Sequence, residues 1–181
     1  MKKQILFIQG AGEGAYEEDE KLATSLQNEL GIEYHVVYPQ MPNEASPEDK
    51  AWMTRISKEI ASLDGKVILV GHSAGGAVLL KYLLKEKIDK PIAGIFLLAI
   101  PYWGPEDDEA DEYTLHEGFA SQLPNGLPIF LYHSRDDEWV PFAHLAIYAE
   151  KLPGATIREF DGRGHQFNND LSEVAADIKS L

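Results

Sequence analysis

The sequence predicts an α/β fold built around a mainly parallel β-sheet. Short apolar runs rich in β-branched residues alternate with segments of helical period, which is typical of this fold class. Several runs are apolar at almost every position, as expected for strands covered on both faces. With 181 residues, no internal repeat and no linker, the chain has the size of one domain, which we expect to span residues 1–181.

The expected strands and helices follow one another along the whole chain. The strands are expected at residues 4–9, 34–38, 66–71, 92–100, 128–134 and 155–160. Helical patterns cover residues 22–30, 52–60 and 77–84, a segment starting near Phe142, and a last segment with Leu171, Val174 and Ile178. Ser46 and Pro47 suit the N-cap and the first position of the second helix. Residues 77–84 are apolar almost all round, which predicts a deeply buried helix.

Composition narrows the function classes. A formal net charge of −14 argues against binding to nucleic acid or to anionic membrane surfaces, because both need a basic face. The chain has no cysteine, which excludes disulfides, thiolate metal sites and a cysteine nucleophile. The apolar run "ILFI" at 5–8 is too short for a signal-peptide core or a membrane span. We therefore expect a cytoplasmic protein.

A glycine-rich loop follows the first expected strand. Gly10, Gly12 and Ala15 fit the dinucleotide-binding pattern G-x-G-x-x-G/A, and Glu33 lies at a tolerable distance for the acid that binds a ribose. The pattern alone is weak evidence, because any tight turn between a strand and a helix favours glycine.

A more specific motif follows the third expected strand. The residues Gly71-His72-Ser73-Ala74-Gly75 match the nucleophile elbow G-x-S-x-G, with an apolar strand before them and a buried helix after them. At such a turn the serine is held in strained backbone angles, and glycines two positions away on each side relieve the crowding. The backbone N–H of Ala74 would then lie at a helix N-terminus, where it can donate to a developing oxyanion.

A serine nucleophile needs a base, and His165 is the best candidate. It lies in the loop "DGRGHQFNND" before the last helix, where two glycines let the backbone bend. The side chain of His72 should point away from that of Ser73. The remaining histidines are expected in strand interiors (His35, His133) or at surface and helix positions (His116, His144). The segment at 116–120 lacks the second histidine of a zinc motif, so we expect no metal site.

The third member of a triad would be a carboxylate that orients the histidine. The segment "HSRDDEWVP" follows the fifth expected strand and offers Asp136 and Asp137. Spacing alone does not choose between them. Asp161 is a weaker candidate, because an aspartate at such a position is typical of a turn. The order serine, acid, histidine is that of α/β-hydrolases.

On the segments "VGHSAGG", "HSRDDEWVP" and "GRGHQF", with "FIQGAG" at the start, the sequence resembles small serine hydrolases of the α/β-hydrolase superfamily. It is most similar to the retinoblastoma-binding-protein type. The resemblance implies that Asp137 is the acid. It also implies a three-layer α/β/α sandwich with sheet order 2-1-3-4-5-6, and neither the usual N-terminal hairpin nor a large cap. Many members carry histidine where this chain has Gln9, which leaves the second oxyanion donor open.

In that strand order the glycine loop faces the elbow across the crevice where ligands bind. The N–H of Ala11 would then join that of Ala74 in an oxyanion hole, and no cofactor is needed. A dinucleotide site would leave Ser73, Asp137 and His165 unexplained.

The predicted reaction is acyl transfer from a small ester, thioester or amide to water. A short polar lid is expected at residues 101–113, with Tyr102 and Trp103 either lining the acyl pocket or packing the loop. The acidic run at 106–112 would disfavour anionic substrates. The alternative is a protein-binding module on a hydrolase scaffold with weak or vestigial activity and an unknown protein partner.

Overall fold

The computed structural model describes residues 2–103, 115 and 118–181. The six strands are β1 (Lys3–Ile8), β2 (Tyr34–Val37), β3 (Val67–His72), β4 (Ile92–Leu98), β5 (Ile129–Ser134) and β6 (Thr156–Phe160). They form one sheet in the order β2-β1-β3-β4-β5-β6, and all the pairings are parallel. The parallel direction is that expected from the sequence pattern, and the sheet order is the one that the resemblance to α/β-hydrolases implies.

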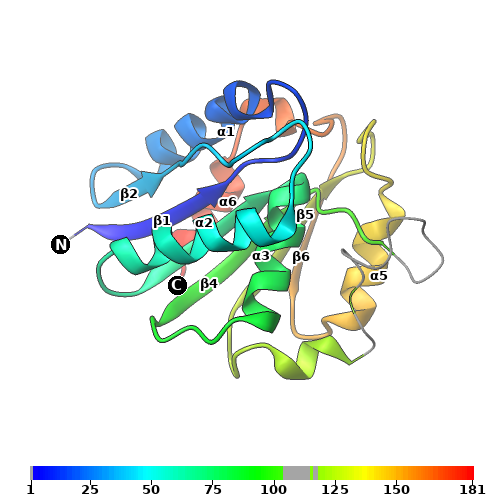
Figure 1. Cartoon of the computed structure of the whole chain (residues 1–181). Helices are drawn as coiled ribbons and strands as arrows, with labels where there is room; N and C mark the ends of the chain where they lie inside the picture. Colours follow the sequence, from blue (N-terminus) through cyan, green and yellow to red (C-terminus); the bar gives the residue numbers. More distant parts are fainter. Residues whose placement is uncertain (1, 104–114, 116–117) are drawn as a thin grey trace.

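Helices cover both faces of the sheet, so the fold is a three-layer sandwich (Figure 1). The helices are α1 (Ala15–Leu30), α2 (Asp49–Ser62), α3 (Ser73–Lys85), α5 (Ala143–Lys151) and α6 (Ser172–Lys179). Helices α1 and α6 pack on one face, and α2, α3 and α5 pack on the other. None of the helices in the described ranges is long and apolar enough to cross a bilayer.

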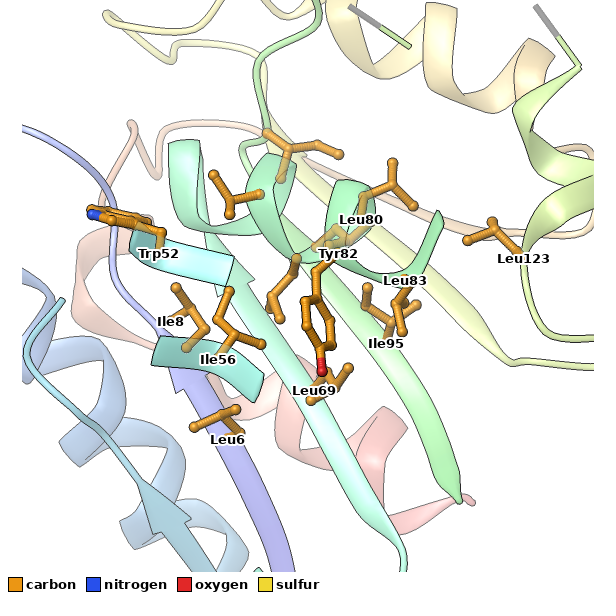
Figure 2. Close-up of a cluster of buried hydrophobic side chains, with 14 of the residues drawn as sticks. Leu6, Ile8, Trp52, Ile56, Leu69, Leu80, Tyr82, Leu83, Ile95 and Leu123 are labelled. Carbon is orange, nitrogen blue, oxygen red and sulfur yellow. The ribbon is translucent and has the colours of Figure 1, made fainter. Parts of the chain in front are cut away.

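Each face of the sheet has its own hydrophobic core, because alternate side chains of a strand point to opposite faces. Leu6 and Ile8 of β1 pack beneath α2 and α3, next to Trp52 and Ile56 (Figure 2). Ile5, the intervening residue, packs against α1 on the other face. Full burial of an aliphatic side chain contributes about 1.5–3 kcal/mol to stability. The two cores therefore fix β1, the strand that leads into the glycine-rich loop, from both sides.

Helix α3 is almost wholly buried, as its apolar sequence predicts. Lys81 is the one buried charged residue of this helix, and its ammonium donates to the carboxylate of Asp49 at the start of α2. Both groups are buried, and each compensates the charge of the other.

The start of α2 differs from the sequence-based expectation. The helix begins at Asp49 with Glu48 as its N-cap, rather than at Pro47 with Ser46 as its N-cap. Ser46 is held in the preceding turn, where its N–H donates to the carbonyl of Asn43 and its own carbonyl accepts from the Asn43 side chain. The local turn of Asn43 therefore prevails over the capping pattern.

Candidate active site

Ser73 lies at the sharp turn between β3 and α3. Its φ is 50°, in the left-handed region that a residue with a Cβ rarely adopts. Gly71 and Gly75 make the turn possible. A Cβ at Gly75 would lie 2.0 Å from the carbonyl oxygen of Gln9, and one at Gly71 would lie 2.5 Å from the Cα of Gly76. The strained serine and the crowded glycines are those expected of a nucleophile elbow.

The parallel strands bring the other candidate residues to the same sheet edge. Asp137 follows β5, and His165 follows β6. The Nδ1 atom of His165 lies 2.8 Å from Oδ2 of Asp137. Nδ1–H therefore donates to the carboxylate, which leaves Nε2 as the nitrogen able to accept a proton. Ser73 and His165 line the same cavity.

The carboxylate of Asp137 is fully buried and accepts several hydrogen bonds. The backbone N–H groups of Trp139 and Val140 both donate to Oδ1 at 2.8 Å. His133 Nε2 lies 3.1 Å from Oδ2 and 3.1 Å from the carbonyl oxygen of Val140, so it carries a proton. Burial alone would raise the pKa of Asp137, but these hydrogen bonds hold it well below the usual range.

The two other aspartates considered from the sequence have different partners. Asp136 accepts from the hydroxyl of Ser134 and from the backbone N–H groups of Arg163 and Gly164, so it holds the loop that carries His165. Asp161 is exposed and pairs with Arg135. Of the three, Asp137 is the one that contacts His165.

The glycine loop lies against the elbow. A Cβ at Gly10 would lie 3.2 Å from the Cβ of Ser73. Glu44 holds the loop, because its carboxylate accepts from the N–H groups of Gly14 and Tyr16 at the start of α1 and from the side chain of Gln9. The described residues provide no acceptor for the N–H of Ala11, and Ala11 is exposed at the cavity.

The candidate site opens into a cavity of about 610 Å³. Ala11, Ala74 and Trp103 line it, together with the exposed Trp139. Tyr102 is not among its lining residues. The Tyr102 ring packs edge-on against the ring of Tyr148 in α5, with 5.5 Å between the ring centres. Of the two expected roles, Tyr102 therefore packs the loop. Most of the expected lid at 101–113, including the acidic run at 106–112, lies outside the described residues.

Two site residues were not anticipated from the sequence. Asp19 lies in the acidic run at 17–20, which by its sequence suits a helix N-terminus, and the side chain of His72 is expected from the sequence to point away from that of Ser73. Both are buried, and they contact each other at 2.8 Å beside Ser73. One sequence signal could have found Asp19: it is the only carboxylate on the apolar face of α1, three residues before Leu22.

The remaining expected roles concern histidines and metals. His133 is a buried, hydrogen-bonded strand residue, as expected, although its contact with Asp137 was not foreseen. The same expectation is wrong for His35, which is exposed on β2, the strand at the edge of the sheet. His144 lies in α5 and accepts from the N–H of Tyr102 at 2.9 Å. His116 lies outside the described residues. No group of three or more His, Asp or Glu side chains in the described ranges is arranged to hold a metal ion.

Known proteins with a similar sequence or fold include several hydrolases. Over 145 residues the chain is 24% identical to the serine hydrolase RBBP9 of Rattus norvegicus, covering 78% of this chain and 74% of that protein. SOBER1 of Arabidopsis thaliana superposes with a TM-score of 0.70 at 22% identity, covering 99% of both chains. A meta-cleavage product hydrolase from Pseudomonas fluorescens superposes with a TM-score of 0.75 at 15% identity, covering 98% of this chain and 89% of that one.

At these identities the solved structures establish the fold, which is that of the α/β-hydrolases. The sequence itself matches the model of the serine hydrolase family over residues 17–171. That match covers most of the chain, including the elbow, both aspartates after β5 and the histidine after β6. The chain belongs to the serine hydrolase family.

Proposed function

We propose that this serine hydrolase cleaves a carboxylic ester, or a related thioester or amide, through an acyl-enzyme. Ser73 attacks the carbonyl carbon while Nε2 of His165 takes the hydroxyl proton. The observation that supports this most is the hydrogen bond of 2.8 Å between His165 and Asp137, in a cavity that Ser73 also lines. It fixes the tautomer in which Nε2 is free to act as a base.

The tetrahedral intermediate needs donors for its oxyanion. In this proposal the N–H groups of Ala11 and Ala74 supply them from opposite sides of the crevice. Ala74 lies in the first turn of α3, where backbone N–H groups have no partner inside the helix. Loss of one such donor costs about 3 kcal/mol of transition-state stabilisation.

The second half of the reaction releases the acyl group. His165 first gives its proton to the leaving group, which departs as an alcohol, thiol or amine. It then takes a proton from a water molecule that attacks the acyl-enzyme. When this intermediate collapses, the proton returns to the oxygen of Ser73 and a carboxylic acid leaves. Asp137 stays ionised throughout, because its hydrogen bonds favour the charged form.

The test is labelling with a fluorophosphonate probe, together with hydrolysis of p-nitrophenyl acetate. The wild-type protein should be labelled and should turn over. Ser73→Ala should abolish labelling and lower kcat by about 10⁴-fold or more. Ser57→Ala is the matched control, because this serine is exposed on α2 and should leave both signals intact. Labelling that survives Ser73→Ala would rule out the assignment of the nucleophile. A wild-type protein that is neither labelled nor active would favour the alternative of a binding module.

A further inference from the structure

A second carboxylate–histidine pair lies directly behind the elbow. Asp19 of α1 and His72 of β3 are each 1% exposed, and Oδ2 of Asp19 lies 2.8 Å from Nδ1 of His72. The pair is separate from the contact between His165 and Asp137, and the mechanism above does not use it. Burying two ionisable groups is costly unless their hydrogen bonds are satisfied, so both side chains need polar partners.

Both ring nitrogens of His72 face acceptors. Nδ1 faces the Asp19 carboxylate, and Nε2 lies 3.0 Å from the backbone carbonyl oxygen of His165. A carbonyl oxygen can only accept, so Nε2 must carry a proton. A proton on Nδ1 as well makes the ring an imidazolium. Burial alone would lower the pKa of His72, but Asp19 raises it above the ordinary value.

The partners of Asp19 favour its ionised form. The N–H of Gly10 donates to Oδ2 at 2.7 Å, and the side-chain amide of Gln166 donates to Oδ1 at 3.0 Å. With the His72 ring, the carboxylate therefore receives three hydrogen bonds. Hydrogen bonds of this kind stabilise a carboxylate in its charged form. The proton that Asp19 and His72 share therefore belongs on the ring.

These contacts connect two segments that the proposed reaction requires to be correctly placed relative to each other. Gly10 precedes Ala11, the proposed oxyanion donor, and the His165 carbonyl belongs to the proposed base. Asp19 holds the first segment, and His72 holds the second. The other titratable groups of the described residues that face His72 come from the loops after β5 and β6: Asp137 attracts the ring, and the centre of the His165 ring lies 4.6 Å from that of His72.

We propose that Asp19 and His72 form a carboxylate–imidazolium pair, charged at a pH of about 7, that positions the Gly10–Ala11 backbone and His165 for the reaction at Ser73. The charge of the pair is a property of the folded protein, whereas its positioning role rests on the proposed function. The two residues are positioning residues, because neither needs to touch the substrate.

The first experiment measures the protonation state of the His72 ring directly. Long-range ¹H–¹⁵N spectra of the histidine rings should show both nitrogens of His72 protonated at a pH of about 7, with the assignment made by loss of the signals in His72→Asn. In Asp19→Asn the ring should lose its second proton, because the carboxylate that holds that proton is gone. Glu17→Gln, which removes a charge from an exposed position of the same helix, should leave the ring doubly protonated. A neutral His72 ring in the wild-type protein would overturn the charged pair, whatever the activity.

The second experiment tests the positioning role by steady-state kinetics. On a neutral p-nitrophenyl ester, Asp19→Asn should lower kcat by about 10²-fold and change KM by less than about threefold, as expected for a misplaced catalytic group. His72→Asn keeps a donor toward Asp19 but loses the one toward the His165 carbonyl, so it should also lower kcat. Glu17→Gln should keep the wild-type kcat.

Thermal unfolding of each variant separates a loss of positioning from a loss of folding. Folded Asp19→Asn and His72→Asn proteins with wild-type kcat would overturn the positioning role. If neither variant folds, the pair is structural and the positioning role is overturned as well. A wild-type protein that never turns over would overturn the proposed function and the positioning with it, while the ring spectra would still decide the charge.

Discussion

Asp136 and Asp137 are neighbours in the chain, yet their side chains have different partners. Asp137 contacts the ring of His165, whereas Asp136 accepts from the backbone N–H groups of the two residues that precede His165. Spacing along the chain could not separate these roles, because adjacent residues after a strand differ only in which way the backbone turns. The N–H groups of Trp139 and Val140 settle the direction of Asp137.

This difference makes the two aspartates a matched pair for mutagenesis. Asp137→Asn should lower kcat by about 10⁴-fold, because an amide can donate to Nδ1 and favour the wrong tautomer of His165. Asp136→Asn should lower kcat far less, by under about tenfold, because its carbonyl oxygen still accepts from the loop. Steady-state kinetics on p-nitrophenyl acetate would measure both. Equal losses in the two variants would contradict the assignment of Asp137 as the orienting acid.

His72 and Asp19 also predict how stability depends on pH. The folded pKa of His72 is raised, although burial opposes this, because Asp19 attracts the charged ring. The stabilisation is therefore fully present below the pKa of the unfolded chain, about 6.5, and is lost as the pH rises through the folded pKa.

The measurement is urea unfolding of wild-type protein and of His72→Asn between a pH of about 6 and about 9. The difference in the free energy of unfolding should shrink as the pH rises. His35→Asn, at an exposed position of β2, should show no such trend. A difference that does not change with pH would contradict the charged pair.

At the scale of elements, the site depends on how closely α3 approaches the end of β1. Helix α3 starts where β3 stops, and its first turn touches the carbonyl of Gln9 at the position of Gly75. The strand, the tight turn and the buried helix could all be predicted from the residues, because each follows from apolar patterning and from glycine. The partners of α1 could not, because periodicity shows which face of a helix is buried but not which residues it meets.

The close approach can be tested at Gly75. A Cβ there would lie 2.0 Å from the Gln9 carbonyl oxygen, so Gly75→Ala should lower the free energy of unfolding by at least about 2 kcal/mol. Gly154→Ala, where no atom lies within 4 Å of the added Cβ, should change it by less than about 0.5 kcal/mol. Urea unfolding of both variants gives the comparison. Equal stabilities would show that α3 and β1 can move apart freely.

At the scale of the molecule, the parallel sheet was predictable from the residues and its strand order from the resemblance to α/β-hydrolases, but the contents of the crevice were not. The alternation of strands and helices favours a parallel sheet, and a parallel sheet gathers the loops that follow its strands at one edge. Which loop side chains enter the cavity depends on backbone turns that no pattern encodes. Tyr102 and Trp103 are adjacent in the sequence, yet Trp103 lines the cavity while Tyr102 packs against α5.

The charge of the molecule also bears on its substrates. The net charge is −14, and Glu13, Glu18 and Glu138 line the cavity with no Lys or Arg among the described lining residues. A p-nitrophenyl ester with a cationic acyl group should therefore be cleaved with a kcat/KM about tenfold above that of an anionic analogue at low salt. Added salt should reduce the ratio by screening.

A charge-neutralising variant identifies the source of this preference. Glu138→Gln should lower the ratio, whereas Glu29→Gln, on α1 outside this cavity, should not. Equal rates for the two esters at low salt would contradict an electrostatic preference of the cavity.

The most direct test of the account is to map where an active-site phosphonate binds. After reaction with a fluorophosphonate, peptide mass spectrometry should place one adduct on the hydroxyl of Ser73 in the wild-type protein. The rate of its formation should fall by orders of magnitude in a folded His165→Ala protein. An adduct on another residue, or an unchanged rate without the imidazole, would mean that the hydroxyl at the elbow and the histidine after β6 do not work together.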